Sequence, residues 1–98
     1  MTEPPPLAVG LMSGTSLDGV DAALVRLEGP THATLIDFVT RPYTDEERAL
    51  IRSAFDGATT AALARLHVQV AEWAAEAVQT VLVQGGVPAS ELSLIAFP

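Results

Sequence analysis

Residues 10–21 read GLMSGTSLDGVD, with three glycines, three hydroxyl side chains and two carboxylates in twelve positions. The segment begins in an apolar run of strand length, residues 7–12, and leads into a second apolar run, residues 20–27. Glycines permit positive φ and close backbone approach, and successive amides in such a turn can form an anion-binding nest. We therefore interpret the segment as a loop between two strands that can bind phosphate.

The two carboxylates indicate which kind of phosphate the loop would accept. Asp18 and Asp21 would repel a bare polyphosphate, but they suit a Mg²⁺ ion placed between them and the phosphate groups. The segment lacks the Gly-Lys-Ser/Thr ending of a P-loop, and a strand follows it where a dinucleotide fingerprint would open a helix. A plain β-hairpin is the alternative, since turns favour the same residue types. Hairpins usually need only two to five loop residues. The polar cluster at residues 13–19 is longer than such a turn requires, which favours metal-nucleotide binding.

The rest of the sequence predicts an α/β fold in the order β-β-β-α-α-β. The turn at residues 28–30 pairs the second and third strands antiparallel, and Thr44 with Glu47 has the spacing of a capping box. Two helices before the last strand form a crossover that would place this strand parallel to a neighbour, which gives a mixed sheet with ligand-binding strand ends. We expect strands at residues 7–12, 20–27, 33–41 and 92–97, and helices at 44–56 and 60–84.

Composition limits the classes of function. The 98 residues are 49% hydrophobic, which is apolar for so small a unit, so we expect some apolar faces to be covered by further protein. A net charge of −7 with only five scattered basic residues argues against nucleic acid. The absence of cysteine excludes disulfides and thiol catalysis. With neither a signal-peptide pattern nor a stretch long enough to span a membrane, we expect a cytoplasmic protein without a membrane partner.

The run GLMSGTSLDGVDAAL, residues 10–24, resembles the N-terminal signature of the anhydro-N-acetylmuramic acid kinases. These are bacterial sugar kinases of the actin, hexokinase and Hsp70-like ATPase superfamily. The resemblance implies a ribonuclease H-like half-domain, apparently truncated, in which residues 1–98 form the N-terminal part of the first actin-like ATPase domain. It also implies ATP- and Mg²⁺-dependent conversion of 1,6-anhydro-N-acetylmuramic acid to N-acetylmuramic acid 6-phosphate, a step of peptidoglycan recycling. Its partners would be the amino sugar and ATP, and the complete protein would form a homodimer.

The resemblance also assigns residues to the site. The catalytic base and most sugar contacts would lie beyond Pro98, so we expect no kinase turnover from the 98 residues alone. Leu11 and Met12 stand where many members of the superfamily carry an aspartate, which leaves open whether Asp18 or Asp21 faces the metal. The alternatives are another sugar kinase of this superfamily, or a non-catalytic fragment or interaction module. The ATP-phosphate segment implied by position is Gly14, Thr15, Ser16, Leu17, Asp18, Gly19, Val20 and Asp21.

Three other residues are interpreted as structural. His67 lies beside the apolar stripe of the second helix and lacks a second ligand at helical spacing, which favours a packed or half-exposed side chain. Trp73 lies on the stripe and is predicted to be core. Asp37 lies within the third strand and is predicted by alternation to point to solvent.

Overall fold

The computed structural model describes residues 5–13 and 17–97. Gly14, Thr15 and Ser16, which belong to the expected phosphate segment, lie outside the described residues. The elements follow the predicted order, and each predicted strand and helix is confirmed to within two residues at its ends. They are β1 Leu7–Ser13, β2 Gly19–Leu27, β3 Ala33–Pro42, α1 Asp45–Phe55, α2 Thr60–Gly85, a 3-10 turn Ala89–Glu91 and β4 Leu92–Ala96.

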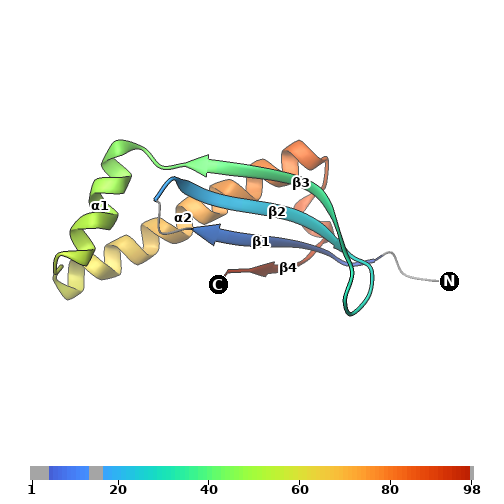
Figure 1. Ribbon diagram of the computed structural model, residues 1–98, viewed down its shortest axis with the longest axis horizontal. Helices are drawn as coiled ribbons and strands as arrows, with labels where there is room; N and C mark the ends of the chain where they lie inside the picture. The colour runs from blue at the N-terminus through green and yellow to red at the C-terminus, as the bar shows by residue number, and fades with distance from the viewer. Residues whose placement is uncertain (1–4, 14–16, 98) are drawn as a thin grey trace.

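The strands form one mixed sheet in the order β3-β2-β1-β4 (Figure 1). β1, β2 and β3 are successive antiparallel neighbours. Ser13, the last residue of β1, pairs with Val20, the second residue of β2. β4 pairs with β1 in parallel because α2 carries the chain back along the sheet before β4 starts. The α/β class, the antiparallel meander and the parallel crossover are therefore confirmed.

The two helices begin and end where their capping residues allow. The Glu47 amide donates to the Thr44 hydroxyl at 3.1 Å, and the Thr44 amide donates to the Glu47 carboxylate at 2.9 Å, which is the predicted capping box. The Thr59 hydroxyl accepts from the Ala62 amide at the start of α2. Gly86 ends α2 in the left-handed conformation at φ 70°, one residue later than the sequence predicts.

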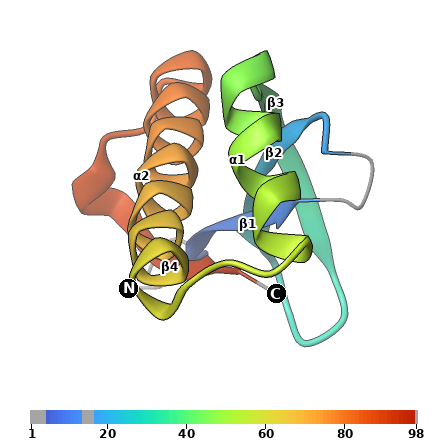
Figure 2. The same ribbon diagram turned by 90° about the vertical axis from the view of Figure 1, so that its left-hand side faces the viewer.

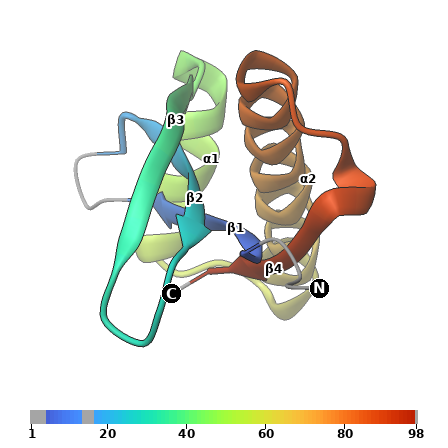
Figure 3. The same ribbon diagram turned by 90° about the vertical axis from the view of Figure 1, so that its right-hand side faces the viewer.

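The core lies between the sheet and α2, and both helices lie on the same side of the sheet (Figures 2 and 3). Alternate residues of β1 and β2 point toward α2, so each strand contributes every second side chain to the core. Trp73 is buried, as predicted, whereas Leu63 near the start of α2 stays about half exposed. Among the described residues, the largest fully buried side chains are Val9, Val20, Leu24 and Val81.

The prediction for Asp37 is wrong. A bulge in the pairing between β2 and β3 places Asp37 opposite the buried Leu24, and therefore on the side of the sheet that faces α2. Its carboxylate accepts a hydrogen bond from Gln84 Nε2 at 2.9 Å, near the end of α2. Strict alternation fails here because the bulge adds one residue to β3.

The sheet face away from α2 is uncovered in the described part of the chain and is rich in apolar side chains. By alternation it carries Met12, Leu35, Phe38 and Leu94, whose exposed fractions run from 49% to 60%. This face accounts for part of the apolar surplus in the composition. Within the described ranges, neither helix has the combination of length and hydropathy that a membrane span requires.

Candidate functional site

The end of β1 and the start of β2, which flank the loop between them, lie at the end of the sheet where β1, β3 and β4 finish, on the side of α1 (Figure 1). Ser13 is the last residue of β1, and Leu17 and Asp18 lead into β2. Strand ends of this kind are common ligand sites in α/β proteins because several chain segments converge there. The structure thus places the described flanks of the polar segment, Ser13 and residues 17–19, at such an edge.

The chain enters β2 through a constrained backbone. Leu17 has φ 56°, a left-handed conformation that is uncommon for a residue with a side chain. A Cβ on Gly19 would lie 2.8 Å from Pro42 Cα and closer still to the Arg41 carbonyl oxygen. Gly19 is therefore required because β2 and β3 come into backbone contact there. The sequence correctly indicates that another group comes close to the backbone of Gly19. That group is the protein's own backbone at Arg41 and Pro42.

The two candidate metal carboxylates have different surroundings. Asp18 is exposed, and its carbonyl oxygen accepts a hydrogen bond from the Tyr43 amide at 2.9 Å. Asp21 Oδ1 accepts from the Thr40 hydroxyl at 2.6 Å, on the sheet face away from α2. Val20 between them is fully buried, so its backbone is the only part that could meet a ligand. Asp21 is thus engaged by a neighbouring strand, whereas the Asp18 carboxylate lies at the surface.

Tyr43, which the sequence did not single out, joins both sides of the loop. Its hydroxyl lies 2.8 Å from Ser13 Oγ, while its amide donates to the Asp18 carbonyl. Tyr43 is 4% exposed, and its ring packs edge-on against Trp73, with 5.5 Å between ring centroids. A lone tyrosine after a proline carries no sequence signal for this role because its partners come from β1, the loop and α2.

Arg41 ties together β3, α1 and α2 next to this site. Its guanidinium donates to both carboxylate oxygens of Glu47, at 2.5 and 2.9 Å, and its Nε donates to Glu76 at 2.7 Å. The same group lies 5.6 Å from the Trp73 ring centroid. The hydrogen bond from Arg41, joined by the capping bonds from Thr44, holds the pKa of Glu47 below its ordinary value, although burial acts in the opposite direction. In turn Glu47 raises the pKa of Arg41.

The lowered pKa of Glu47 predicts an acid-dependent loss of stability. A carboxylate whose folded-state pKa is depressed stabilises the fold above its ordinary pKa of 4.5 and loses this effect as the pH falls through the folded value. Glu47→Gln should therefore lower the free energy of unfolding by about 1 to 2 kcal/mol at neutral pH. Urea unfolding should show the difference from wild type shrinking below pH 4.5. Glu72→Gln, at an exposed position of α2, should stay near wild type, and a difference that persists in acid would contradict this assignment.

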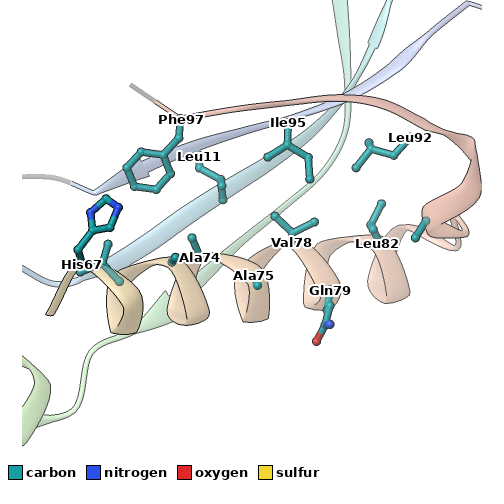
Figure 4. A pocket seen from close by; sticks show the side chains of 13 residues that line it. Leu11, His67, Ala74, Ala75, Val78, Gln79, Leu82, Leu92, Ile95 and Phe97 are labelled. Atoms are coloured by element: carbon teal, nitrogen blue, oxygen red, sulfur yellow. The ribbon is translucent and has the colours of Figure 1, made fainter. Parts of the chain in front are cut away.

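Two hollows flank this part of the molecule. The larger, about 770 Å³, lies between α2 and the β1–β4 pair and is almost wholly apolar (Figure 4). Figure 4 shows His67 and Phe97 together at one end of it and Leu82 with Leu92 at the other. The smaller, about 410 Å³, is lined by Ser13, Leu17 and Tyr43 together with side chains of α1 and α2. Only the smaller one is lined by residues flanking the loop.

Comparison with known proteins identifies the family of this chain. The model of the anhydro-N-acetylmuramic acid kinase family matches residues 6–97, which is nearly the whole chain. The chain belongs to the anhydro-N-acetylmuramic acid kinase family. The resemblance carried by residues 10–24 is thereby confirmed.

Curated anhydro-N-acetylmuramic acid kinases are similar over most of the chain. One from Rhodopseudomonas palustris strain HaA2 is 40% identical over 98 residues, covering 92% of this chain and 27% of the relative. One from Salinibacter ruber is 42% identical over 92 residues, covering 89% of this chain and 23% of the relative. One from Zymomonas mobilis is 48% identical over 56 residues, covering 57% and 15% respectively. The chain thus spans at most about a quarter of the length of these anhydro-N-acetylmuramic acid kinases.

The names of these relatives, which are kinases, imply that they use ATP, and the described residues of this chain limit how a metal-nucleotide could be held. No group of three or more potential metal ligands occurs within residues 5–13 and 17–97. A Mg²⁺ ion commonly keeps several waters and takes one or two carboxylates together with substrate phosphates. The described part of the chain does not form an all-protein metal cage, and the Asp18 carboxylate is exposed.

Proposed function

We propose that this chain supplies the ATP-phosphate-binding loop of an anhydro-N-acetylmuramic acid kinase. The observation that carries the proposal is the family match over residues 6–97 together with the position of the loop flanks at a strand edge. Residues 14–21 would face the phosphates, chiefly through backbone amides and hydroxyl groups. Asp18 would lie on the magnesium side, because Asp21 is already engaged by Thr40.

The ion pairing of the basic residues supports backbone and metal recognition of the phosphates. The chain has five basic residues, and three of them form ion pairs within the fold. Arg41 is held by Glu47 and Glu76, Arg48 by Asp45, and Arg26 by Glu28. A triphosphate would therefore meet oriented amides here, and bound Mg²⁺ would neutralise part of its charge.

The reaction would be transfer of the γ-phosphoryl group of ATP to the 6-oxygen of 1,6-anhydro-N-acetylmuramic acid, with water opening the anhydro bridge. The product, N-acetylmuramic acid 6-phosphate, would enter peptidoglycan recycling in the cytoplasm. Phosphoryl transfer depends on several groups held in mutual register. Since the chain spans about a quarter of its relatives, we propose that the base and the sugar contacts come from other parts of a homodimeric enzyme. The 98 residues alone would then be inactive.

The sheet order supports a ribonuclease H-like half-domain for residues 1–98. The order of three strands, two helices and a fourth strand suits the half-domain that the resemblance implies, and in the structure the fourth strand lies parallel to the first. The uncovered apolar sheet face and the apolar groove beside α2 fit a unit that packs against further protein.

Replacing Asp18 tests the proposed function. In a titration with Mg-ATP followed by NMR, we expect amide shifts at the loop flanks, Leu17 to Gly19, and an affinity about tenfold lower in Asp18→Asn, the size of one charge-assisted contact. Binding of ATP in the presence of EDTA should change much less, because the lost group acts through the metal.

The matched control is Asp37→Asn, which removes a carboxylate hydrogen-bonded to α2 rather than to the loop. Its affinity for Mg-ATP should equal that of the wild type. An equal loss in this control, or shifts that avoid the loop flanks altogether, would count against the proposal.

A further inference from the structure

Tyr43 makes a contact on each side of the loop between β1 and β2. Before the loop, its hydroxyl forms a 2.8 Å hydrogen bond with the Ser13 hydroxyl. After the loop, its amide donates to the carbonyl oxygen of Asp18 at 2.9 Å. Ser13 and Asp18 are five positions apart in sequence, so one buried side chain and its own backbone span the loop.

Tyr43 is itself held by three other elements. Its ring packs edge-on against Trp73 of α2, and its carbonyl oxygen accepts a hydrogen bond from Arg48 Nη1 of α1 at 3.1 Å. It directly follows Pro42, the last residue of β3 and the residue whose backbone confines Gly19. Because these supports come from α1, α2 and β3, movement of the tyrosine is restricted from several directions.

The backbone beside Asp18 benefits from such restraint. Leu17 has φ 56°, which is unfavourable for a leucine and persists only where the surroundings hold it. The hydrogen bond from Tyr43 to Asp18 acts on the adjacent peptide group, and Gly19 permits the close strand contact that follows. The contacts of Tyr43 therefore fix the path by which the chain enters β2.

The hydroxyl pair adds a chemical effect. When the Tyr43 hydroxyl donates to Ser13 Oγ, the Ser13 hydrogen is free to donate to a third group. An anion beside Ser13 would favour this direction of the pair, since it needs the serine as a donor. The same contact thus both fixes the loop and orients a donor beside it.

From these contacts we infer that Tyr43 is a positioning residue for nucleotide binding: it sets the spacing of Ser13 and Asp18 and orients the Ser13 hydroxyl toward a bound phosphate. The inference rests on the proposed function of the loop. Tyr43 acts through Ser13 and Asp18, without touching the nucleotide itself. The ligand is a metal-bound nucleoside triphosphate.

Tyr43→Phe isolates the hydroxyl, because phenylalanine keeps the ring contact with Trp73 and the amide donor to Asp18. We expect Mg-ATP affinity to fall by about threefold to tenfold, the range for loss of one hydrogen bond. In a Ser13→Ala background the effect of Tyr43→Phe should disappear, since the partner hydroxyl is already gone. Ser53→Ala, which removes an exposed hydroxyl bonded to Leu50 in α1, should leave the affinity unchanged.

A variant that weakens the core away from the loop distinguishes the positioning role of Tyr43 from a merely structural role. Val78→Ala weakens core packing in α2 without contacting the loop flanks, and it should leave Mg-ATP affinity at the wild-type value. In the ligand-free protein, Tyr43→Phe should speed hydrogen exchange at the Ser13, Val20 and Tyr43 amides and leave that of Val81 unchanged.

The outcomes distinguish the two proposals. Wild-type protein that shows no amide shifts with Mg-ATP would contradict the proposed function of the loop. If the wild type binds, equal affinity in Tyr43→Phe, or an equal loss in Val78→Ala, would overturn the role of Tyr43 alone. Unchanged exchange at the flanking amides in Tyr43→Phe would overturn it as well, whether or not nucleotide binds.

Discussion

Gly19→Ala should lower the free energy of unfolding by about 3 kcal/mol, the upper part of the range for an overpacked site. The added methyl group would meet the backbone of Arg41 and Pro42, and it would lie 2.8 Å from Pro42 Cα. Backbone atoms of a paired strand cannot rotate away as a side chain can. Relief would require β2 and β3 to separate at their first pairing, Gly19 with Pro42, next to Tyr43.

Urea unfolding followed by fluorescence measures this effect, since Trp73 is the only tryptophan and is buried in the core. The matched control is Gly10→Ala in β1, where an added Cβ would meet no atom within 4 Å and φ is not positive. Alanine should be neutral or slightly stabilising there, because it reduces the freedom of the unfolded chain. Equal destabilisation by the two substitutions would show that the strand contact at Gly19 is not the cause.

Arg41→Met should destabilise the fold by about 2 to 3 kcal/mol, between the values for exposed and fully buried ion pairs. Methionine retains much of the aliphatic volume but leaves Glu47, whose side chain is only 14% exposed, without its bidentate partner. It also removes the bond to Glu76 and the cation beside the Trp73 ring. The loss is expected to be large because one side chain connects β3 to both helices.

Arg26→Met provides the comparison for Arg41. Arg26 lies 3.7 Å from Glu28, and the two side chains are 44% and 34% exposed, so its loss should change stability by less than about 0.5 kcal/mol. In a double-mutant cycle, Arg41→Met should be much less costly in a Glu47→Gln background, since no buried carboxylate is then left unpaired. Additive effects in this cycle would mean that Arg41 stabilises the fold through Glu76, Trp73 or packing, and not through Glu47.

Local patterns predicted most of the elements. The capping box of Thr44 and Glu47 acts within one helical turn, and it located the start of α1. The spacing of apolar residues along α2 correctly placed Trp73 in the core, although the stripe is buried only in the later part of the helix. The polar loop after β1 was found by composition and by its resemblance to a family signature, which the family match supports.

Contacts between distant residues were not accessible in this way. Tyr43 and Ser13 are 30 positions apart, and Arg41 and Glu76 are 35 apart, so neither pair leaves a local pattern. The orientation of Asp37 was predicted wrongly because alternation assumes a regular strand, whereas β3 contains a bulge. The roles of Gly14, Thr15 and Ser16 remain predictions from the sequence.

The sequence by itself determined the order of elements, the helix caps, the polar loop and the family, because these depend on residue spacing within a few positions or on a recognisable signature. Only the tertiary structure decided that Gly19 is confined by β3, that Tyr43 spans the loop, and that Arg41 joins β3 to both helices. Those relations depend on strand register and on the placement of α2 over the sheet. Register and helix placement arise from the packing of the whole core, so no short segment encodes them alone.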